Sequence, residues 1–337
     1  EMHGMRTSDH DLAQARREKR QGIDKEGSAS IEAFLFLIQN TKLDLRQETK
    51  YNGRKNDTAK RRAKMGQIEK QIQDLRYLEW TKTRHSSGTA GSFLKAFETR
   101  GGRKLYYKLS DYDSVRGIVG HECVNEIIAD RLLSILNIKH LSYRLIHARI
   151  QIRGTEHETY LCVSEDFKEK GESKIALDAF YDMEAEPGEK PLDFCMRMGW
   201  ADYIWDMLTI DHLIQNRDRH GANMEVLRSK KDKTIRLAPL FDHGLSFVFA
   251  CHDDESLSNR QAFEEPRIQC FVGSNSARDN LNLIPVSKMK KLPMFDENIK
   301  HQLFADLDNI VTDRWINTVW EQLKWRAEIY EDIRNSR

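Results

Sequence analysis

The sequence predicts a mixed α+β fold with two lobes, a small β/α lobe over residues 84–167 and a larger, mostly helical lobe over residues 168–335. A helical N-terminal extension over residues 5–83 precedes them. Three observations predict this division. The extension is highly charged, strand-like and helix-like segments alternate after Ser86, and helical patterns dominate the last half of the chain.

The N-terminal extension is expected to contain two or three helices. It carries one apolar stretch, Ile31–Ile38, and a polar, basic linker over residues 52–64. A later segment has apolar residues at helical spacing, namely Ile68, Ile72, Leu75 and Leu78. The basic residues fit either a solvated helical face or an arm that binds DNA or a partner protein. Because no aromatic residues interleave the charges, the solvated face is the favoured interpretation.

In the small lobe, strands are expected before and after one long helix along the chain. It begins with a glycine- and hydroxyl-rich turn, Ser86–Ser92, and a strand at Lys104–Leu109 follows a Gly-Gly turn. The helix, roughly His121–Leu136, has its apolar residues at helical spacing. Two further strands, Tyr143–Ile152 and Glu158–Val163, are separated by a glycine turn.

The large lobe is expected to be helical apart from one pair of strands. A segment rich in Trp, Met and Tyr, Pro191–Leu213, predicts a long helix that is interrupted at most at Gly199. Residues 298–335 supply two further helices with charged outer faces. Two short strands flank a Lys-Lys-Asp-Lys turn, Met224–Arg228 and Thr234–Leu237. Residues 250–295 are polar and irregular, and their pattern predicts no element.

Composition excludes several classes of protein. The 54 Lys and Arg residues nearly balance the 53 Asp and Glu residues, so a whole-protein field that attracts nucleic acid or anionic membrane is not indicated. The five cysteines are scattered without a metal-binding or redox spacing, which is typical of reduced thiols. No apolar run approaches the roughly 20 residues of a membrane span. We therefore expect a cytoplasmic protein with no membrane partner.

Three oxygen-bearing side chains carry the strongest chemical signal. Asp218 and Asn223 lie five residues apart on a segment expected to leave a helix and enter a strand. Asp242 follows the next predicted strand. Phosphoryl transfer needs a carboxylate to orient the attacking hydroxyl group and hard oxygen ligands for Mg²⁺, and these residues provide that set. A histidine metal site is disfavoured, because the spacing of the nearby histidines fits no zinc motif.

The two segments around these residues resemble those of the HipA-like serine/threonine kinases. That family carries Asn-x-Asp-x-His-x-x-Asn in its catalytic loop, which the segment Asn216–Asn223 matches. It later carries an apolar-Ala-Pro-x-(Tyr/Phe)-Asp motif, which Leu237–Asp242 matches. The first motif also resembles the catalytic loop of phosphatidylinositol 3/4-kinases. The resemblance covers roughly residues 84–335 and implies a protein-kinase-like fold that uses ATP and Mg²⁺.

The resemblance implies a role for each residue of the catalytic loop. Asp218 resembles the catalytic carboxylate, and Asn223 and Asp242 resemble the Mg²⁺ ligands. His220 is expected to order the loop or to donate a hydrogen bond on the phosphate side. Arg217 and Arg219 flank Asp218 and are expected either to neutralise developing charge or to pair with a phosphorylated loop.

The resemblance also implies a nucleotide site in the small lobe. Lys108 resembles the lysine that holds the α- and β-phosphates, and Glu126 resembles its helix partner, with Glu122 as the rival. Glu165 to Phe167 occupy the position of the adenine-binding hinge. The Ser86–Ser92 turn resembles the phosphate-covering loop, in which the family can carry an autophosphorylated serine. Its expected contributors are Ser87, Gly88, Thr89 and Gly91.

These motifs describe the nucleotide side of a reaction and leave the acceptor open. We expect a protein Ser/Thr kinase that acts on another protein or on itself. The alternatives are a kinase for a small molecule or lipid head group, a nucleotide-binding regulatory module, and an interaction protein. The extension over residues 5–83 does not match the family's largely β N-terminal subdomain, so its role and any antitoxin-like partner stay open.

Overall fold

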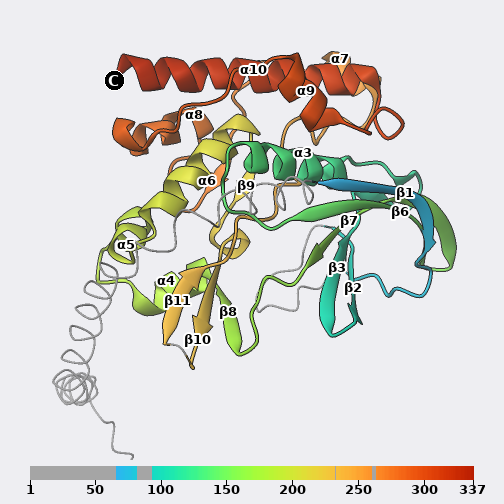
Figure 1. Cartoon of the computed structure of the whole chain (residues 1–337), viewed down its shortest axis with the longest axis horizontal. Helices are drawn as coiled ribbons and strands as arrows, with labels where there is room; N and C mark the ends of the chain where they lie inside the picture. The colour runs from blue at the N-terminus through green and yellow to red at the C-terminus, as the bar shows by residue number, and fades with distance from the viewer. Residues whose placement is uncertain (1–65, 82–92, 232, 260–262) are drawn as a thin grey trace, which may run out of the picture. The chain divides into compact units, whose positions relative to one another are not determined.

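The computed structural model describes residues 66–81, 93–231, 233–259 and 263–337, which form two lobes (Figure 1). The helices expected within residues 5–65 and the turn at Ser86–Ser92 lie outside the described residues. Of the N-terminal extension, only residues 66–81 are described. Among the described residues, no helix is both long and apolar enough to cross a membrane. The five cysteines are all free thiols.

The small lobe is built on a five-stranded sheet with the order β1-β6-β7-β3-β2. Its strands are β1 (Gln67–Asp74), β2 (Lys95–Arg100), β3 (Arg103–Lys108), β6 (Tyr143–Ile152) and β7 (Thr155–Glu165). Two of the turns have positive φ at both central residues, Gly101 and Gly102 between β2 and β3, and Arg153 and Gly154 between β6 and β7. That backbone matches the twist of the strands it joins, which explains the glycines. The predicted strands at 104–109, 143–152 and 158–163 are confirmed.

Strand β1 is a correction to the sequence analysis, which predicts a helix around Ile68 to Leu78. Residues 67–74 instead pair in parallel with β6, so the sheet begins before residue 84. The strand lies at the edge of the sheet, and its register shifts between Glu69 and Gln73, which breaks the alternation that would mark a strand. Its partner lies about 75 residues further along the chain, and no local pattern encodes that pairing.

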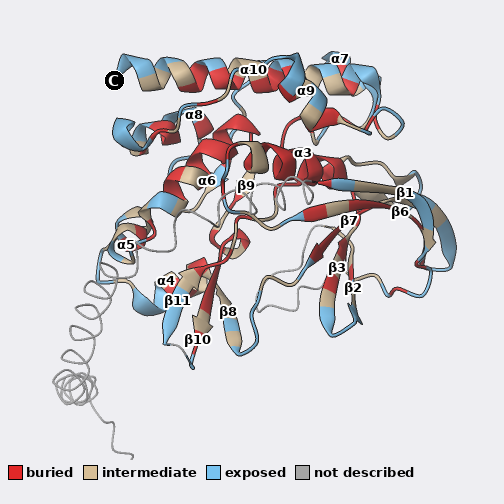
Figure 2. Ribbon diagram, viewed as in Figure 1, coloured by how far each residue is buried: buried red, intermediate tan, exposed pale blue. Residues whose placement is uncertain are grey.

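Helix α3 (Glu122–Ile135) lies between the sheet and the large lobe (Figures 1 and 2). It contacts β6 and β7 on one side and α9 (Glu297–Phe304) on the other. Twelve of its 14 residues are buried, so it is surrounded on all sides rather than amphipathic. The short hairpin of β4 (Tyr112–Asp113) and β5 (Gly117–Ile118) connects β3 to α3. The predicted helix at 121–136 is confirmed.

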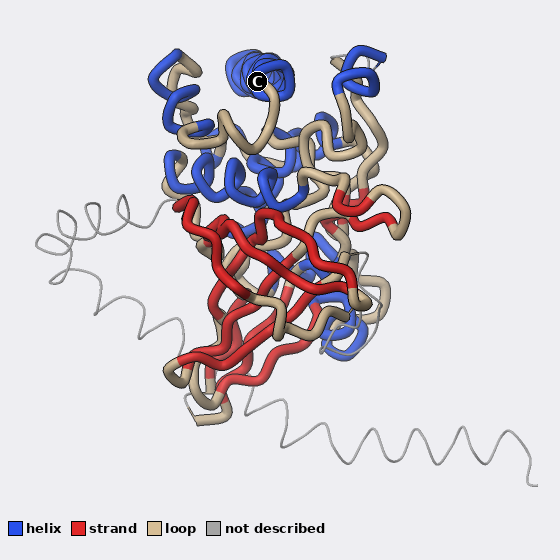
Figure 3. Tube along the Cα trace, turned by 90° about the vertical axis from the view of Figure 1, so that its right-hand side faces the viewer, coloured by secondary structure: helices blue, strands red, loops and turns tan. Residues whose placement is uncertain are grey.

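The large lobe is mainly helical, and Figure 3 shows the helices gathered beyond the strands of the small lobe. Helices α5 (Pro191–Arg197) and α6 (Ala201–Leu213) are separated at Gly199, whose φ of 75° ends the first one. The other α-helices are α4 (Leu177–Glu184), α7 (Asp254–Asn259), α8 (Ala277–Asn280) and α10 (Asp313–Ser336). Three 3₁₀ turns are η1 (Gly221–Asn223), η2 (Leu281–Leu283) and η3 (Val286–Lys288). The two helices expected within 298–335 are confirmed as α9 and α10.

Two small sheets complete the large lobe. A three-stranded antiparallel sheet has the order β11-β10-β8, formed by β8 (Glu172–Ala176), β10 (Glu225–Ser229) and β11 (Thr234–Leu237). A two-stranded parallel pair joins β9 (Asp218–Arg219) to β12 (Gln269–Cys270). The segment 250–295, for which no element was predicted, therefore includes a strand that lies beside Asp218.

The edge strand gives the first testable prediction. A helix would bury both Ile72 and Leu75 on one face, whereas in the structure Ile72 is 43% exposed and Leu75, just after β1, is 2% exposed. We expect Leu75→Ala to lower the free energy of unfolding by about 2–5 kcal/mol. Ile72→Ala, the matched control, should change it by less than about 0.5 kcal/mol. Urea unfolding of both variants measures the difference, and equal losses would contradict the strand.

Candidate active site

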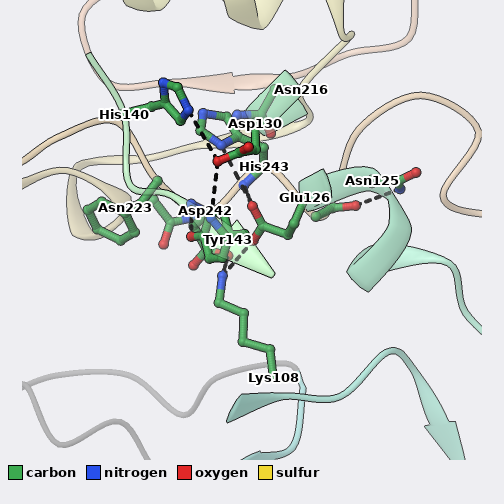
Figure 4. A network of polar contacts seen from close by, with 12 residues as sticks. Lys108, Asn125, Glu126, Asp130, His140, Tyr143, Asn216, Asn223, Asp242 and His243 are labelled. Atoms are coloured by element: carbon green, nitrogen blue, oxygen red, sulfur yellow. Dashed lines mark hydrogen bonds and ion pairs between the residues drawn. The ribbon is translucent and has the colours of Figure 1, made fainter. Parts of the chain in front are cut away.

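Lys108, the last residue of β3, places its ammonium group between two carboxylates (Figure 4). Its Nζ lies 2.6 Å from Oε1 of Glu126 and 2.7 Å from Oδ1 of Asp242. Burial by itself lowers the pKa of Lys108, but Asp242 and Glu126 outweigh it and hold the pKa well above its usual value. The group is therefore a permanent cation at the point where the two lobes meet.

Glu126 makes this contact from the middle of α3, where its side chain is 2% exposed. Its second oxygen, Oε2, accepts a hydrogen bond of 2.9 Å from the backbone N–H of His243. Burial raises the pKa of Glu126, yet Lys108 and His243 more than offset that and the pKa lies below its usual value. The rival, Glu122, instead accepts a hydrogen bond of 3.0 Å from the Asp111 N–H. The structure thus brings Lys108 to Glu126 and not to Glu122.

Asp242 lies in a turn a few residues after the end of β11. Its φ of 62° is a left-handed conformation that is disfavoured for a residue other than glycine. The turn is held by its neighbours, since the Asp242 N–H donates to Oη of Tyr143 over 3.3 Å and the next N–H donates to Glu126. The side chain of His243 is buried, and burial lowers its pKa.

The segment that carries Asp218 follows α6, which ends at Leu213. Asn216 orders it, because Nδ2 donates to Oδ1 of Asp211 over 2.9 Å and Oδ1 accepts from the Asp218 N–H over 3.2 Å. Asn223, at the end of η1, donates from Nδ2 to Oδ2 of Asp218 over 3.0 Å and to its backbone oxygen over 2.8 Å. The matched residues of the first motif thus form one connected loop around Asp218.

His220 lies beside Asp218 rather than in a cavity. Its Nδ1 accepts a hydrogen bond from the Ala222 N–H over 3.1 Å, so the neutral ring carries its proton on Nε2. That nitrogen is 3.4 Å from Oδ1 of Asp218. The arrangement suits a residue that orders the loop and orients the carboxylate.

The expectation for Arg219 was wrong. Both arginines that flank Asp218 were expected either to neutralise developing charge or to pair with a phosphorylated loop. The side chain of Arg219 is fully buried and binds both oxygens of Asp211, each over 2.8 Å. Nη1 also donates to the carbonyl oxygen of Phe241 over 2.8 Å. These contacts fix Asp218 relative to the segment that carries Asp242, and they leave no group of Arg219 facing the site. Arg217 donates from Nε to the Arg267 carbonyl oxygen over 3.0 Å.

A cavity of about 340 Å³ opens beside Lys108 and Asp242. Glu165 and Phe167, expected at the adenine-binding hinge, line it. Six aromatic residues line it, namely Phe97, Tyr106, Tyr107, Tyr143, Phe167 and Phe241. A smaller polar pocket adjoins it and is lined by Lys108, Glu126, Asp218, Asn223 and Asp242. A cavity with aromatic residues in its wall next to a polar pocket suits a ligand with a flat ring at one end and anionic groups at the other.

The polar pocket also fits a magnesium ion. Among the described residues, no group of three or more His, Cys, Asp or Glu side chains could hold a metal. Mg²⁺ in phosphoryl-transfer sites does not need such a cage, because one or two protein oxygens plus phosphate and water complete its shell. The Asn223 amide nitrogen donates to Asp218, so the amide oxygen is the atom that would bind a cation, and Asp242 lines the same pocket. The donor set is hard and anionic, as Mg²⁺ requires.

Some site residues were missed by the sequence analysis. Tyr106 lies two residues before Lys108 on the same strand, so both side chains point to one face, and that spacing is a signal that could have found it. Tyr143 has no comparable signal, because it is simply the first residue of β6. The expected phosphate-loop residues Ser87, Gly88, Thr89 and Gly91 lie outside the described residues, and their role stays a prediction.

The strands, the buried α3 and the loop geometry define a two-lobed, protein-kinase-like α+β fold. In sequence, the chain is 40% identical over 52 residues to the serine/threonine-protein kinase CtkA of Helicobacter pylori, which covers 15% of this chain and 16% of that protein. The match therefore spans about a sixth of the length of that curated relative. No family model matches the chain.

One solved structure, that of CtkA, supports the same fold. The crystal structure of the Helicobacter pylori proinflammatory kinase CtkA superposes with a TM-score of 0.53 and 14% identity, over 79% of this chain and 98% of that chain. The hydra Fam20 structure with sugar gives a TM-score of 0.36 at 14% identity, over 78% and 88% of the two chains. The fold class predicted from the sequence is confirmed.

Removal of the Glu126 charge gives the second testable prediction. Because the folded pKa of Glu126 is lowered, its ionised form stabilises the protein above the unfolded pKa, and this stabilisation is lost as pH falls through the folded pKa. We expect Glu126→Gln to lower the free energy of unfolding by about 3 kcal/mol at neutral pH, since it breaks a buried ion pair. Urea titrations between neutral and acidic pH should show that the difference in unfolding free energy between the two proteins shrinks below the pH range in which a glutamate ordinarily titrates. A difference that stays constant with pH would contradict the ion pair.

Proposed function

We propose that this chain is a kinase that transfers the γ-phosphoryl group of ATP to a hydroxyl group in a Mg²⁺-dependent reaction. The observation that carries the proposal is the meeting of Lys108, Glu126 and Asp242 beside Asp218 and Asn223, next to an aromatic cavity. These groups come from both lobes and share one polar pocket. A fold with this arrangement supplies positioning and charge, which is what phosphoryl transfer requires from a protein.

Each residue has a defined task in this proposal. Lys108 binds phosphate oxygens, and Glu126 holds its ammonium group in place. Asp218 accepts a hydrogen bond from the acceptor hydroxyl and takes its proton. Asn223 and Asp242 would hold Mg²⁺, which offsets the charge of the phosphate groups. The aromatic side chains around the cavity would enclose the base.

The finer assignment is a HipA-like protein Ser/Thr kinase that phosphorylates a partner protein or itself. Its support is the pair of motifs at Asn216–Asn223 and Leu237–Asp242, which bracket the site. We propose the Ser86–Ser92 turn as the phosphate-covering loop and the region of autophosphorylation. We further propose that the N-terminal extension contacts a protein or a DNA-binding partner, and that the chain acts in the cytoplasm, as its five free thiols suggest.

Asp218→Asn tests the catalytic carboxylate. The amide keeps the shape and the contact with Asn223 on one side, but it cannot accept the proton of the hydroxyl. We expect kcat to fall by about 10²–10⁴-fold while ATP binding changes little. The measurement is phosphate incorporation from labelled ATP, followed by mass spectrometry of the protein. Asp308→Asn, at an exposed position shortly after the end of α9, is the control. Undiminished activity of Asp218→Asn would remove this residue from the reaction.

Asp242→Asn tests the metal site. The change removes one anionic ligand and also one partner of Lys108, so the affinity for Mg²⁺ should fall more than that for nucleotide alone. Since a contact to a charged group contributes about 1.5–3 kcal/mol, the Mg²⁺ concentration needed for half-maximal ATP binding should rise by about tenfold or more. Thermal-shift titrations of Mg²⁺ at fixed ATP measure this. A variant with the wild-type Mg²⁺ requirement would show that Asp242 is no ligand.

A further inference from the structure

Asn125 is a buried residue of α3 without a task in the proposed chemistry. Its side chain is 0% exposed. Its Nδ2 donates two hydrogen bonds to the loop that follows Asp242, over 2.8 Å to the Gly244 carbonyl and over 3.0 Å to the Ser246 carbonyl (Figure 4). One amide group thus holds two backbone positions of the segment that carries the expected metal ligand.

The loop needs such support, because both of its ends have a disfavoured backbone. Asp242 has a φ of 62° and Phe247 a φ of 55°, and neither is a glycine. No regular element spans the residues between them. Their conformation is therefore set by contacts with the surrounding structure, and Asn125 supplies two of these contacts.

The opposite side of the loop contacts the catalytic segment. The Leu245 carbonyl accepts a hydrogen bond of 2.9 Å from the N–H of Arg217, the residue before Asp218. The Phe247 N–H donates to the Ile214 carbonyl over 2.8 Å. The two acceptors of Asn125 therefore flank Leu245, and a shift of this loop would move both Asp242 and Asp218.

Helix α3 is a rigid anchor for this contact. It is buried on nearly all sides, and it also carries Glu126, which binds Lys108 and the His243 N–H. The loop approaches it closely at Gly244, where an added Cβ would lie 3.2 Å from Cβ of Glu122. The absence of a side chain at Gly244 lets the backbone reach the amide of Asn125.

We propose that Asn125 is a positioning residue, which fixes Asp242 and Asp218 relative to Lys108 through the loop at 242–247. The inference rests on the proposed function, because it assigns those three residues to the reaction. It adds that the helix which supplies Glu126 also sets the geometry of the metal ligand through a neutral amide. Loss of the amide would leave two buried carbonyl oxygens without this donor, and the loop would shift to find others.

The test compares Asn125→Leu with Arg131→Met. Both changes remove a buried donor to backbone carbonyls from the same helix, but Arg131 binds the carbonyls of Gly66, Leu303 and Ala305, away from the site. The probes are Mn²⁺ with ADP, measured by binding titration, and ATP turnover. For Asn125→Leu we expect the Mn²⁺ concentration for half-maximal ADP binding to rise by about tenfold, the equivalent of one to two neutral hydrogen bonds, together with a fall in kcat.

Arg131→Met should lower Tm but keep the wild-type Mn²⁺ requirement. If Asn125→Leu does not fold, Asn125→Ser leaves room for a bridging water and should show a smaller shift in the same direction. A folded Asn125 variant with wild-type Mn²⁺ requirement and kcat overturns the proposal, as does an equal shift in Arg131→Met. A wild-type chain that binds Mn²⁺–ADP but transfers no phosphoryl group contradicts the proposed function alone, and the Mn²⁺ titration still decides the role of Asn125. A wild-type chain that binds no Mn²⁺–ADP overturns both.

Discussion

The paired charges around Lys108 are the constraint on which the rest of the site depends. A partly buried ammonium group is costly unless carboxylates compensate it, and here Glu126 and Asp242 approach it to 2.6 and 2.7 Å. The three residues come from β3, from α3 and from the turn after β11. Their contact therefore joins the sheet, the buried helix and the large lobe at one point. Loss of either carboxylate would leave the Lys108 ammonium group with only one of its two partners.

The large lobe holds Asp218 by a second buried ion pair. Arg219 binds both oxygens of Asp211 and reaches the Phe241 carbonyl, one residue before Asp242. The end of α6 is in turn anchored to α10, where Arg326 hydrogen-bonds the His212 carbonyl and His212 Nε2 contacts the Arg326 carbonyl over 3.0 Å. Asp218 is thus held by contacts with the helical core, while Lys108 and Glu126 approach from the small lobe. A static frame of this kind suits a reaction that depends on positioning.

The sequence predicts those parts of the fold and site that have a local signal. The helix at 121–136 and the strands at 143–152 and 234–237 agree with α3, β6 and β11, because apolar spacing and turn residues encode them locally. The prediction for residues 67–74 is wrong, because β1 pairs with a distant strand and its edge position removes the alternation of apolar and polar residues that marks a strand. The choice between Glu122 and Glu126 could not be made from spacing, because the two lie one helical turn apart. The burial of Arg219 likewise depends on tertiary structure. An arginine next to an aspartate looks the same in sequence whether its side chain faces solvent or the core.

The formal charge of the polar pocket explains why nucleotide and metal are expected to bind together. Four carboxylates line it and contribute four negative charges, and two ammonium groups contribute two positive charges, namely those of Asp218, Asp242, Glu126, Glu122, Lys108 and Lys95. A triphosphate that entered alone would meet this net charge of −2, and the repulsion would be unfavourable. On the proposed function, Asp242 and Asn223 would hold a divalent cation whose charge would offset that repulsion, and Lys108 would bind phosphate oxygens. In the free protein, the ion pair between Lys108 and Asp242 holds both charged groups at the site.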